Sequence, residues 1–307
     1  MKKPVEGLPV SVQVRLVRHA QAIGLNPNLV LGRYATERFL YRLSKTPHAD
    51  RFILKGGLLM LVWLGENIRP TRDIDLLGCG DLSERALVQT FAEVCTAQVV
   101  PDGVEYLADS IEVGPIRRGD EHGGMRVHLQ GRLGKARLFL QVDVGIGDSV
   151  EPPPEWLAYP SLLGFPGPRL RAYRPETTIA EKLHAMVTLG EANSRMRDYF
   201  DVYSLSQRLG FEGDSLAAAV RSTFVKRGTP IPRELPVALT AQFGASRDKQ
   251  MQWEAFVKKG DIVSAPIDLH LVVERVAAFL LPVIRGTGDR SGHKVHWEPE
   301  GPWTPRK

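Results

Sequence analysis

Two aspartates, Asp73 and Asp75, lie one residue apart in a segment, residues 71–77, whose pattern predicts a short strand. Because alternate side chains of a strand share a face, both carboxylates point the same way, while Ile74 and Leu76 point into the core. Two carboxylates about 7 Å apart along a strand repel each other unless a cation lies between them. Carboxylate oxygens suit Mg²⁺, which commonly binds one or two carboxylates together with substrate phosphates. The spacing favours a magnesium site, although an isolated Asp-x-Asp pair is more often simply solvated.

A third carboxylate, Asp143, lies in a second predicted strand, residues 137–144. Four apolar residues form one face of this strand, which leaves Asp143 on the other face. If this strand neighbours the one that carries Asp73, three carboxylates converge, as in two-metal sites for in-line displacement at phosphorus. Taken alone, an aspartate in this position is more often an edge-strand residue or a loop anchor.

A turn at Lys55, Gly56 and Gly57 connects a short predicted strand to a compact predicted helix, residues 58–64. Without side chains, the two glycines let the backbone approach a phosphate closely. The N–H groups at the start of the helix would add donors and the positive end of its dipole. Lys55 and Arg72 would add charge against a triphosphate. A Gly-Gly pair alone is usually only a turn, but its place before the two aspartates and the later Asp143 indicates nucleotide chemistry.

Composition is that of a globular protein of two ordinary domains, with 307 residues, 43% hydrophobic and 24% charged. The formal net charge of +5 mildly favours a polyanionic partner. Cys79 and Cys95 can form neither a disulfide scaffold nor a cysteine zinc site. The beginning of the chain has no signal-peptide pattern, and the longest apolar run, residues 56–64, is far short of a membrane span. A cytoplasmic protein without a membrane partner is expected.

The first domain is predicted to span residues 1–155. It opens with two helices, the first capped by Ser11 and the second by Asn28, and the basic residues of the second helix are expected to be partly exposed. Beyond the two aspartates follow a helix over residues 83–97 and two antiparallel strands joined near Gly134 and Lys135.

A proline run at residues 151–154 suggests the domain boundary. Residues 156–290 are predicted to form a mainly helical domain that completes the active-site groove. The remaining residues, 291–307, lack periodicity and are predicted to form a flexible tail.

The helical domain contains two further candidate residues. Thr178 and Glu181 form a capping-box pattern, which predicts the start of a helix that carries Lys182 at the edge of its apolar stripe. The next predicted helix points Asp198 away from its apolar side, and Asp201 is a secondary candidate there. The simpler alternatives are a lysine that reaches into solvent and a surface pair of Asp198 with a neighbouring arginine.

Taken together, these motifs resemble the AbiEii/AbiGii nucleotidyltransferase toxins, the toxin half of type IV toxin–antitoxin and phage abortive-infection systems, a group that includes the MenT-type mycobacterial toxins. The resemblance covers about residues 33–209. It implies an α+β fold, with a polymerase-β-like nucleotidyltransferase core (a small mixed sheet flanked by helices) and a C-terminal helical domain. The matching segments are residues 55–57 with 69–76, 141–145, 177–183 and 193–201.

The resemblance also assigns roles to residues. Lys182 matches the family's conserved lysine and Asp198 its last motif. Many polymerase-β-like transferases have Gly-Ser where this chain has Gly56-Gly57, so backbone N–H groups would replace the serine hydroxyl.

The implied cofactor is Mg²⁺ in a two-metal site. Asp73 and Asp75 would hold the two ions on a nucleoside triphosphate (NTP), and Asp143 would complete the site and help to deprotonate the attacking hydroxyl. The glycine pair and Lys182 would steady the β- and γ-phosphates.

The implied activity is transfer of a nucleoside monophosphate (NMP) from NTP to an RNA acceptor, with the 3′ end of tRNA as the leading candidate, which would block translation. A cognate antitoxin is the implied partner. Two alternatives remain open: nucleotidylation of a protein or small-molecule hydroxyl, and a noncatalytic RNA- or protein-binding module.

Overall fold

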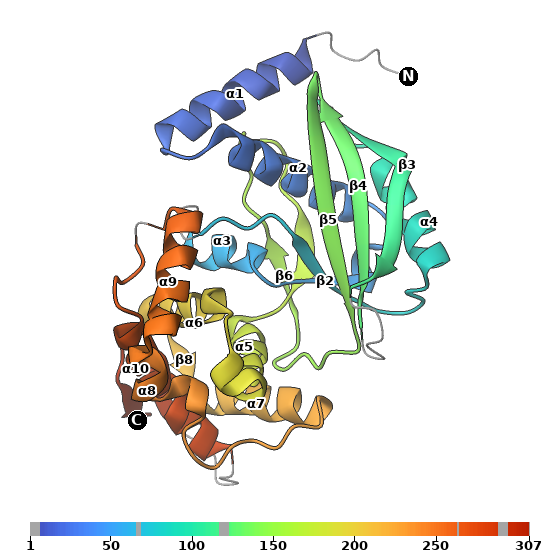
Figure 1. Cartoon of the computed structure of the whole chain (residues 1–307). Helices are drawn as coiled ribbons and strands as arrows, with labels where there is room; N and C mark the ends of the chain where they lie inside the picture. Colours follow the sequence, from blue (N-terminus) through green and yellow to red (C-terminus); the bar gives the residue numbers. More distant parts are fainter. Residues whose placement is uncertain (1–6, 66–68, 117–122, 263, 288–293, 307) are drawn as a thin grey trace. The chain divides into compact units, whose positions relative to one another are not determined.

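The computed structural model describes residues 7–65, 69–116, 123–262, 264–287 and 294–306 (Figure 1). The chain folds into two compact units. Unit 1 comprises Met1–Val62, Pro70–Gly147 and Glu155–Ala172, and unit 2 comprises Trp63–Arg69, Asp148–Pro154 and Tyr173–Lys307. This division differs from a single boundary near residue 155, because the segment after the proline run returns to unit 1 and adds two strands to its sheet.

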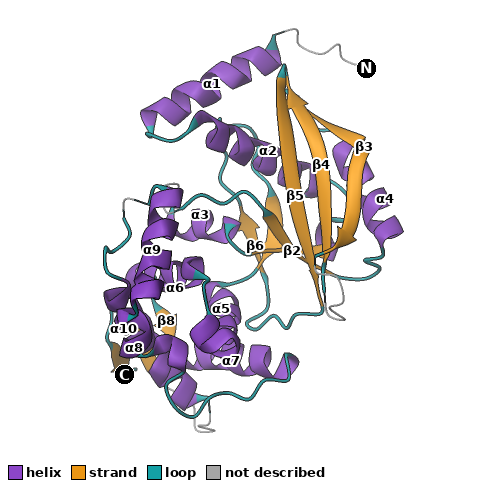
Figure 2. Ribbon diagram, viewed as in Figure 1, coloured by secondary structure: helices purple, strands orange, loops and turns teal. Residues whose placement is uncertain are grey.

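Unit 1 contains a seven-stranded sheet with the strand order β3-β4-β5-β2-β1-β7-β6 (Figure 2). Strands β2 and β5 are parallel, as are β1 and β7, and all other neighbours are antiparallel. The strands are β1 Phe52–Lys55, β2 Ile74–Gly78, β3 Val104–Pro115, β4 Met125–Leu133, β5 Ala136–Ile146, β6 Glu155–Ala158 and β7 Arg169–Ala172. The predicted mixed sheet is confirmed, and it is larger than expected because β3, β6 and β7 were not predicted.

Helices cover one face of this sheet. Helix α2 packs against β5 and α4 packs against β3 (Figure 1). Phe39 on α2 contacts both Phe91 on α4 and Tyr106 on β3, which places the core on this side. Alternate residues of β4 and β5 are buried there, so their other residues face outward. The helices of this unit are α1 Leu8–Ala22, α2 Pro27–Leu43, α3 Leu58–Leu64 (from Trp63 on assigned to unit 2) and α4 Glu84–Cys95, with a short 3₁₀ turn, η1 Ala49–Arg51.

The caps predicted for the first two helices are wrong. Helix α1 already begins at Leu8, so Ser11 lies inside it. Helix α2 is capped by Asn26, whose side chain accepts a hydrogen bond of 2.9 Å from the N–H of Asn28. Both helices start early because each has a proline in its first turn, where the missing N–H has no cost.

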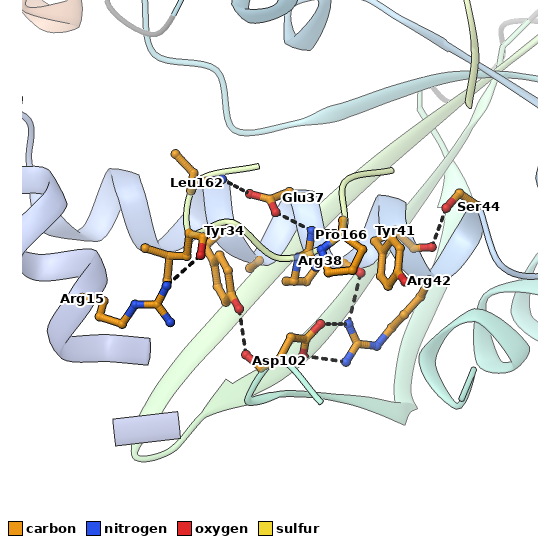
Figure 3. A network of polar contacts seen from close by, with 12 residues as sticks. Arg15, Tyr34, Glu37, Arg38, Tyr41, Arg42, Ser44, Asp102, Leu162 and Pro166 are labelled. Atoms are coloured by element: carbon orange, nitrogen blue, oxygen red, sulfur yellow. Dashed lines mark hydrogen bonds and ion pairs between the residues drawn. The ribbon is translucent and has the colours of Figure 1, made fainter. Parts of the chain in front are cut away.

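Helix α2 buries Arg33, Arg38 and Arg42, which were expected to be partly exposed. Figure 3 shows part of the reason for Arg42: its guanidinium binds both oxygens of Asp102 at 2.7 and 3.0 Å. It also donates to the carbonyl of Val104 at 2.9 Å. A buried charge is tolerated when it is paired in this way. The pair fixes α2 to the chain at the entrance to β3.

The neighbouring Arg38 anchors a loop of unit 1. It pairs with Glu37 and donates to the carbonyl of Pro166 at 2.9 Å, while Glu37 accepts the N–H of Leu162 at 2.9 Å (Figure 3). The loop before β7 is thereby held by charged side chains of α2. A helical periodicity analysis misses this because the partners lie more than 100 residues away.

Unit 2 is mainly helical, as predicted. The elements of unit 2 are α5 Pro175–Leu189, α6 Met196–Arg208, α7 Gly213–Lys226, α8 Ala241–Ala245, α9 Arg247–Gly260, α10 Leu269–Gly286, the 3₁₀ turns η2 Gly190–Ala192 and η3 Val237–Leu239, and a three-stranded sheet of β8 Phe211–Glu212, β9 Val295–Trp297 and β10 Trp303–Pro305. Among the described residues of both units, no helix is long and apolar enough to cross a membrane.

The prediction of a flexible tail is wrong for residues 294–306. They form β9 and β10, and β9 pairs with β8. Trp297 is buried and donates to the carbonyl of Ser206 at 2.7 Å, while Trp303 stacks on Phe279 at 5.6 Å between ring centroids. Two tryptophans thus hold a segment that lacks periodicity. The rest of the predicted tail, residues 291–293 and 307, lies outside the described residues.

The predicted capping box is also wrong. Helix α5 begins at Pro175, so Thr178 lies inside the helix, where its side chain is buried. The apolar stripe is confirmed, since Ile179 and Leu183 are fully buried. This stripe fixes the direction in which Lys182 leaves the helix.

Candidate active site

Four charged residues form a row across neighbouring strands of unit 1. Asp75 on β2 lies opposite Lys55 on β1 and opposite Asp143 on β5, and Asp143 lies opposite Arg126 on β4. Directly opposed residues of adjacent strands point to the same face. The condition set by the sequence, that the strand of Asp143 lies beside the strand that follows Asp73, is therefore met. We call Lys55, Asp75, Asp143 and Arg126 the charged row.

The turn after β1 is built around Asp75. Gly56 has a φ of +73°, and a Cβ atom at this position would lie 2.1 Å from Oδ2 of Asp75. The N–H of Gly57 donates to the Asp75 carboxylate. The missing side chain of Gly56 thus leaves room for the Asp75 carboxylate, and the N–H of Gly57 binds it. Helix α3 begins directly after the two glycines.

Burial raises the pKa of Asp75 to about 6. Lys55 opposes this shift, whereas the negative charges of Asp143 and Asp73 reinforce it, and the Gly57 N–H opposes it. A carboxyl group whose ionised form is disfavoured by neighbouring carboxylates is in a place where added positive charge is stabilising. Asp73 is half-buried directly before β2, and Arg72 beside it is exposed.

Arg126 occupies both oxygens of Asp143. Its Nε lies 2.8 Å from Oδ1 and its Nη2 2.7 Å from Oδ2, and the amide of Gln141 adds a contact of 3.2 Å to Oδ1. We did not predict Arg126 as a site residue. The sequence carried a signal, because a hairpin turn at Gly134 and Lys135 sets a register that places residue 126 opposite residue 143.

The three predicted metal ligands fit a divalent cation by their chemistry, since all are hard carboxylate donors and Asp75 lies among negative charges. Within the described ranges, however, no three His, Cys, Asp or Glu side chains are gathered as a ready metal site.

Unit 2 holds a second charged group, which we call the ion cluster. The ammonium of Lys182 lies 2.7 Å from Oδ1 of Asp198 and 2.8 Å from Oδ2 of Asp201. Arg69 binds both oxygens of Asp201 at 2.6 and 2.7 Å, and Arg195 lies 2.7 Å from Oδ2 of Asp198. The alternative of a surface pair between Asp198 and a neighbouring arginine is wrong in its position: Asp198 does pair with Arg195, but it and Asp201 are fully buried, which their cationic partners make tolerable.

Two members of the ion cluster, Asp201 and Lys182, have pKa values shifted in favour of their charged forms. Burial would raise the pKa of Asp201, but Arg69 and Lys182 outweigh burial and lower it to about 2. Burial likewise disfavours the charged form of Lys182, but Asp198 and Asp201 outweigh it and raise its pKa. Lys182 is thus a cation at every physiological pH.

The predicted site residues therefore fall into two groups. Unit 1 brings together Lys55, Gly56, Gly57, Asp75 and Asp143, and unit 2 brings together Lys182 and Asp198. Asp201, the secondary candidate, also contacts Lys182, and Arg69, which binds Asp201, is the addition that the structure makes to the second group.

We expect Gly56→Ala to destabilise the protein by about 2–4 kcal/mol, because an alanine here combines a left-handed backbone with a collision against Asp75. Gly24→Ala is the matched control, since Gly24 also has a positive φ (+69°) but nothing lies within 4 Å of its Cβ position. Denaturant unfolding measures the loss of unfolding free energy in each variant, and the difference between the two losses is the cost of the collision with Asp75. Equal losses in unfolding free energy would show that the Asp75 side chain moves away without cost.

Comparison with known proteins identifies the fold and the family of the chain. Two solved structures match the chain at 17% identity and a TM-score of 0.51: an H. pylori protein described as a nucleotidyltransferase, covering 86% of this chain and 97% of that one, and JHP933 from Helicobacter pylori, covering 87% and 96%. At this identity the match shows the fold, which confirms the predicted nucleotidyltransferase core. A search among curated proteins gave no match.

The model of the family described as "Nucleotidyl transferase AbiEii toxin, Type IV TA system" matches residues 38–275. The chain belongs to this AbiEii family of nucleotidyl transferase toxins.

Proposed function

We propose that this protein transfers an NMP from an NTP to an RNA acceptor, with the 3′ end of tRNA as the leading candidate, and that it does so with Mg²⁺. The observation that carries the proposal is the pairing of Asp75 with Asp143 on parallel neighbouring strands, beside the Gly56-Gly57 turn. Family membership implies an NTP substrate and an antitoxin partner.

In the proposed reaction, Asp73, Asp75 and Asp143 would hold the divalent cations. When bound, these ions would neutralise the triphosphate and stabilise the charge that develops as pyrophosphate is displaced from the α-phosphorus. Asp143 accepts the proton of the attacking hydroxyl, whose oxygen bonds to the α-phosphorus as pyrophosphate leaves. The backbone of Gly56 and Gly57 fixes the position of Asp75, so the protein contributes mainly placement and charge.

Lys182 and Asp198 are proposed as catalytic positions from the family motifs. Lys182 would bind a β- or γ-phosphate oxygen, which requires a charged ammonium. The two carboxylates beside it supply this condition, since they raise the pKa of Lys182. Lys55 and Arg72 are proposed to contribute further positive charge toward the triphosphate.

An RNA acceptor is favoured by the outward face of the β4–β5 hairpin. Phe139 lies on the same face as Asp143, four residues along β5, and is 73% exposed. Arg132 and Arg137, which lie opposite each other at the end of the hairpin, are also exposed. An exposed aromatic ring beside arginines on a sheet face is typical of surfaces that stack single-stranded bases and bind phosphates.

The test is to incubate the purified protein with total tRNA, Mg²⁺ and each α-³²P-labelled NTP, with Asp73→Ala/Asp75→Ala as the inactive control. We expect label in RNA that the control lacks. If the label appears instead in the protein itself or in an added partner protein, the RNA acceptor is wrong and the acceptor is a protein. No label under any condition would instead favour a noncatalytic binding module.

Phe139→Ala tests the acceptor surface in the same assay. We expect the KM for RNA to rise about 10-fold with little change at saturating RNA, because one stacked base is worth about 1–3 kcal/mol. Val225→Ala, which truncates an exposed apolar side chain on α7, is the control. An unchanged KM in Phe139→Ala would remove this surface from the acceptor site.

A further inference from the structure

The contact between Arg126 and Asp143 uses the same atoms that the proposed metal site needs. The guanidinium binds both oxygens of the carboxylate, and Gln141 already contacts one of them. A bidentate guanidinium satisfies a carboxylate in its own plane. These three contacts take most of the roughly four acceptor positions of the carboxylate, so a divalent cation that binds Asp143 competes with Arg126.

The exposure of the pair allows such an exchange. The side chain of Arg126 is 36% exposed and that of Asp143 is 17% exposed. Solvent-exposed ion pairs contribute about 0–1 kcal/mol, and a bidentate, partly buried pair such as this one lies toward the upper end of that range. The contact can open without unfolding β4, whose backbone is paired with β3 on one side and β5 on the other.

The charges of the row are also arranged for a nucleotide that carries a metal ion. Its order across the sheet is positive, negative, negative, positive: Lys55, Asp75, Asp143 and Arg126. The two inner carboxylates suit a cation, and the two outer cations suit the phosphate oxygens around it. Arginine fits this position better than lysine, since its planar fork matches carboxylate and phosphate equally.

We propose that Arg126 is a nucleotide-binding residue that exchanges partners: it pairs with Asp143 before the metal binds, and it binds the triphosphate once the metal has taken Asp143. This inference rests on the proposed function. It adds to that function a residue outside the predicted site and an order of events, in which cation binding releases the guanidinium for the substrate.

The test uses Mn²⁺ as the probe, followed by its paramagnetic signal, and a non-reactive α,β-methylene NTP analogue. Arg126→Met should bind Mn²⁺ alone about 3- to 5-fold more tightly, because Asp143 is already available. The same variant should bind the analogue in the presence of Mn²⁺ about 10-fold more weakly, because a charged contact to phosphate is lost. Arg85→Met, at an exposed arginine of α4, should change neither affinity.

The opposite signs of the two effects are the signature of the exchange. If Arg126→Met leaves both affinities unchanged, or weakens Mn²⁺ binding, the exchange is wrong and the contact is structural. Asp143→Asn and Asp75→Asn separate this result from failure of the proposed function. If neither of these variants weakens Mn²⁺ binding, the metal site itself is wrong; if both weaken it while Arg126→Met has no effect, only the exchange fails.

Discussion

An Asp75→Asn variant should lose nucleotidyl transfer by roughly 1,000-fold while it keeps its fold. The side chains have the same shape, so the narrow space beside Gly56 is respected, and the amide oxygen still accepts the N–H of Gly57. What disappears is the negative charge in the middle of the charged row. Removing one preorganised electrostatic group from an active site commonly lowers kcat by about 10²–10³-fold.

The same variant should be as stable as the wild type or more stable at pH 7. Burial raises the pKa of Asp75 to about 6, so the ionised carboxylate is disfavoured in the folded protein. The protonated group contributes stability that is present below its unfolded pKa, near 3.8, and is lost as the pH rises through about 6. The advantage of asparagine should therefore appear between these pH values and stay constant above them.

Single-turnover labelling and thermal unfolding from pH 4 to 8 check both statements. Asp109→Asn, at an exposed position of β3, is the matched control and should change neither activity nor Tm. Retained transfer in Asp75→Asn would remove Asp75 from the catalytic centre. A lower Tm at pH 7 would mean that its negative charge stabilises the fold, contrary to the repulsion described above.

The core of the candidate site was predictable because it is local. The strand that ends at Lys55, the glycine pair, the helix and the strand with Asp75 follow one another within 27 residues, and alternation places Asp75. The predicted strand began too early, because β2 starts at Ile74 and Asp73 lies directly before it. The tight turn at Gly134 likewise sets the register of β4 and β5, and alternation leaves Asp143 on the face of β5 opposite its buried apolar residues. The pairing of β5 with β2 is long-range, and the sequence offered it only as a condition. Patterns of period 2 are read directly from a sequence.

The ion cluster of unit 2 was not predictable in this way, because it depends on ion pairs between residues that are distant in the sequence. Arg69 and Asp201 are separated by 132 residues, so neither residue predicts the other. Rules of burial place aspartates at the surface, and Asp198 and Asp201 break them because their partners come from other segments. The strand β3 escaped prediction for a different reason: its register shifts between Leu107 and Glu112, which interrupts the alternation of apolar residues.

Asp201→Asn should produce the largest loss of stability, because it leaves buried cations without their carboxylate. Asp201 is fully buried, binds Arg69 through both oxygens and lies 2.8 Å from Lys182. Removing one member of a buried ion pair costs about 3–5 kcal/mol, which corresponds to a fall in Tm of roughly 5–15 °C. Asp248→Asn, at an exposed position of α9, is the control and should be nearly neutral.

The pH dependence identifies the cause of this loss. Arg69 and Lys182 overcome burial and lower the pKa of Asp201 to about 2, so its contribution is complete above the unfolded pKa near 3.8 and is lost as the pH falls through about 2. The gap in unfolding free energy between wild type and Asp201→Asn should be constant from pH 5 to 8 and shrink below pH 4. A gap that persists at acid pH would assign the loss to packing. In a double-mutant cycle, Arg69→Met should cost much less in the Asp201→Asn background than in the wild type, because its partner is already gone.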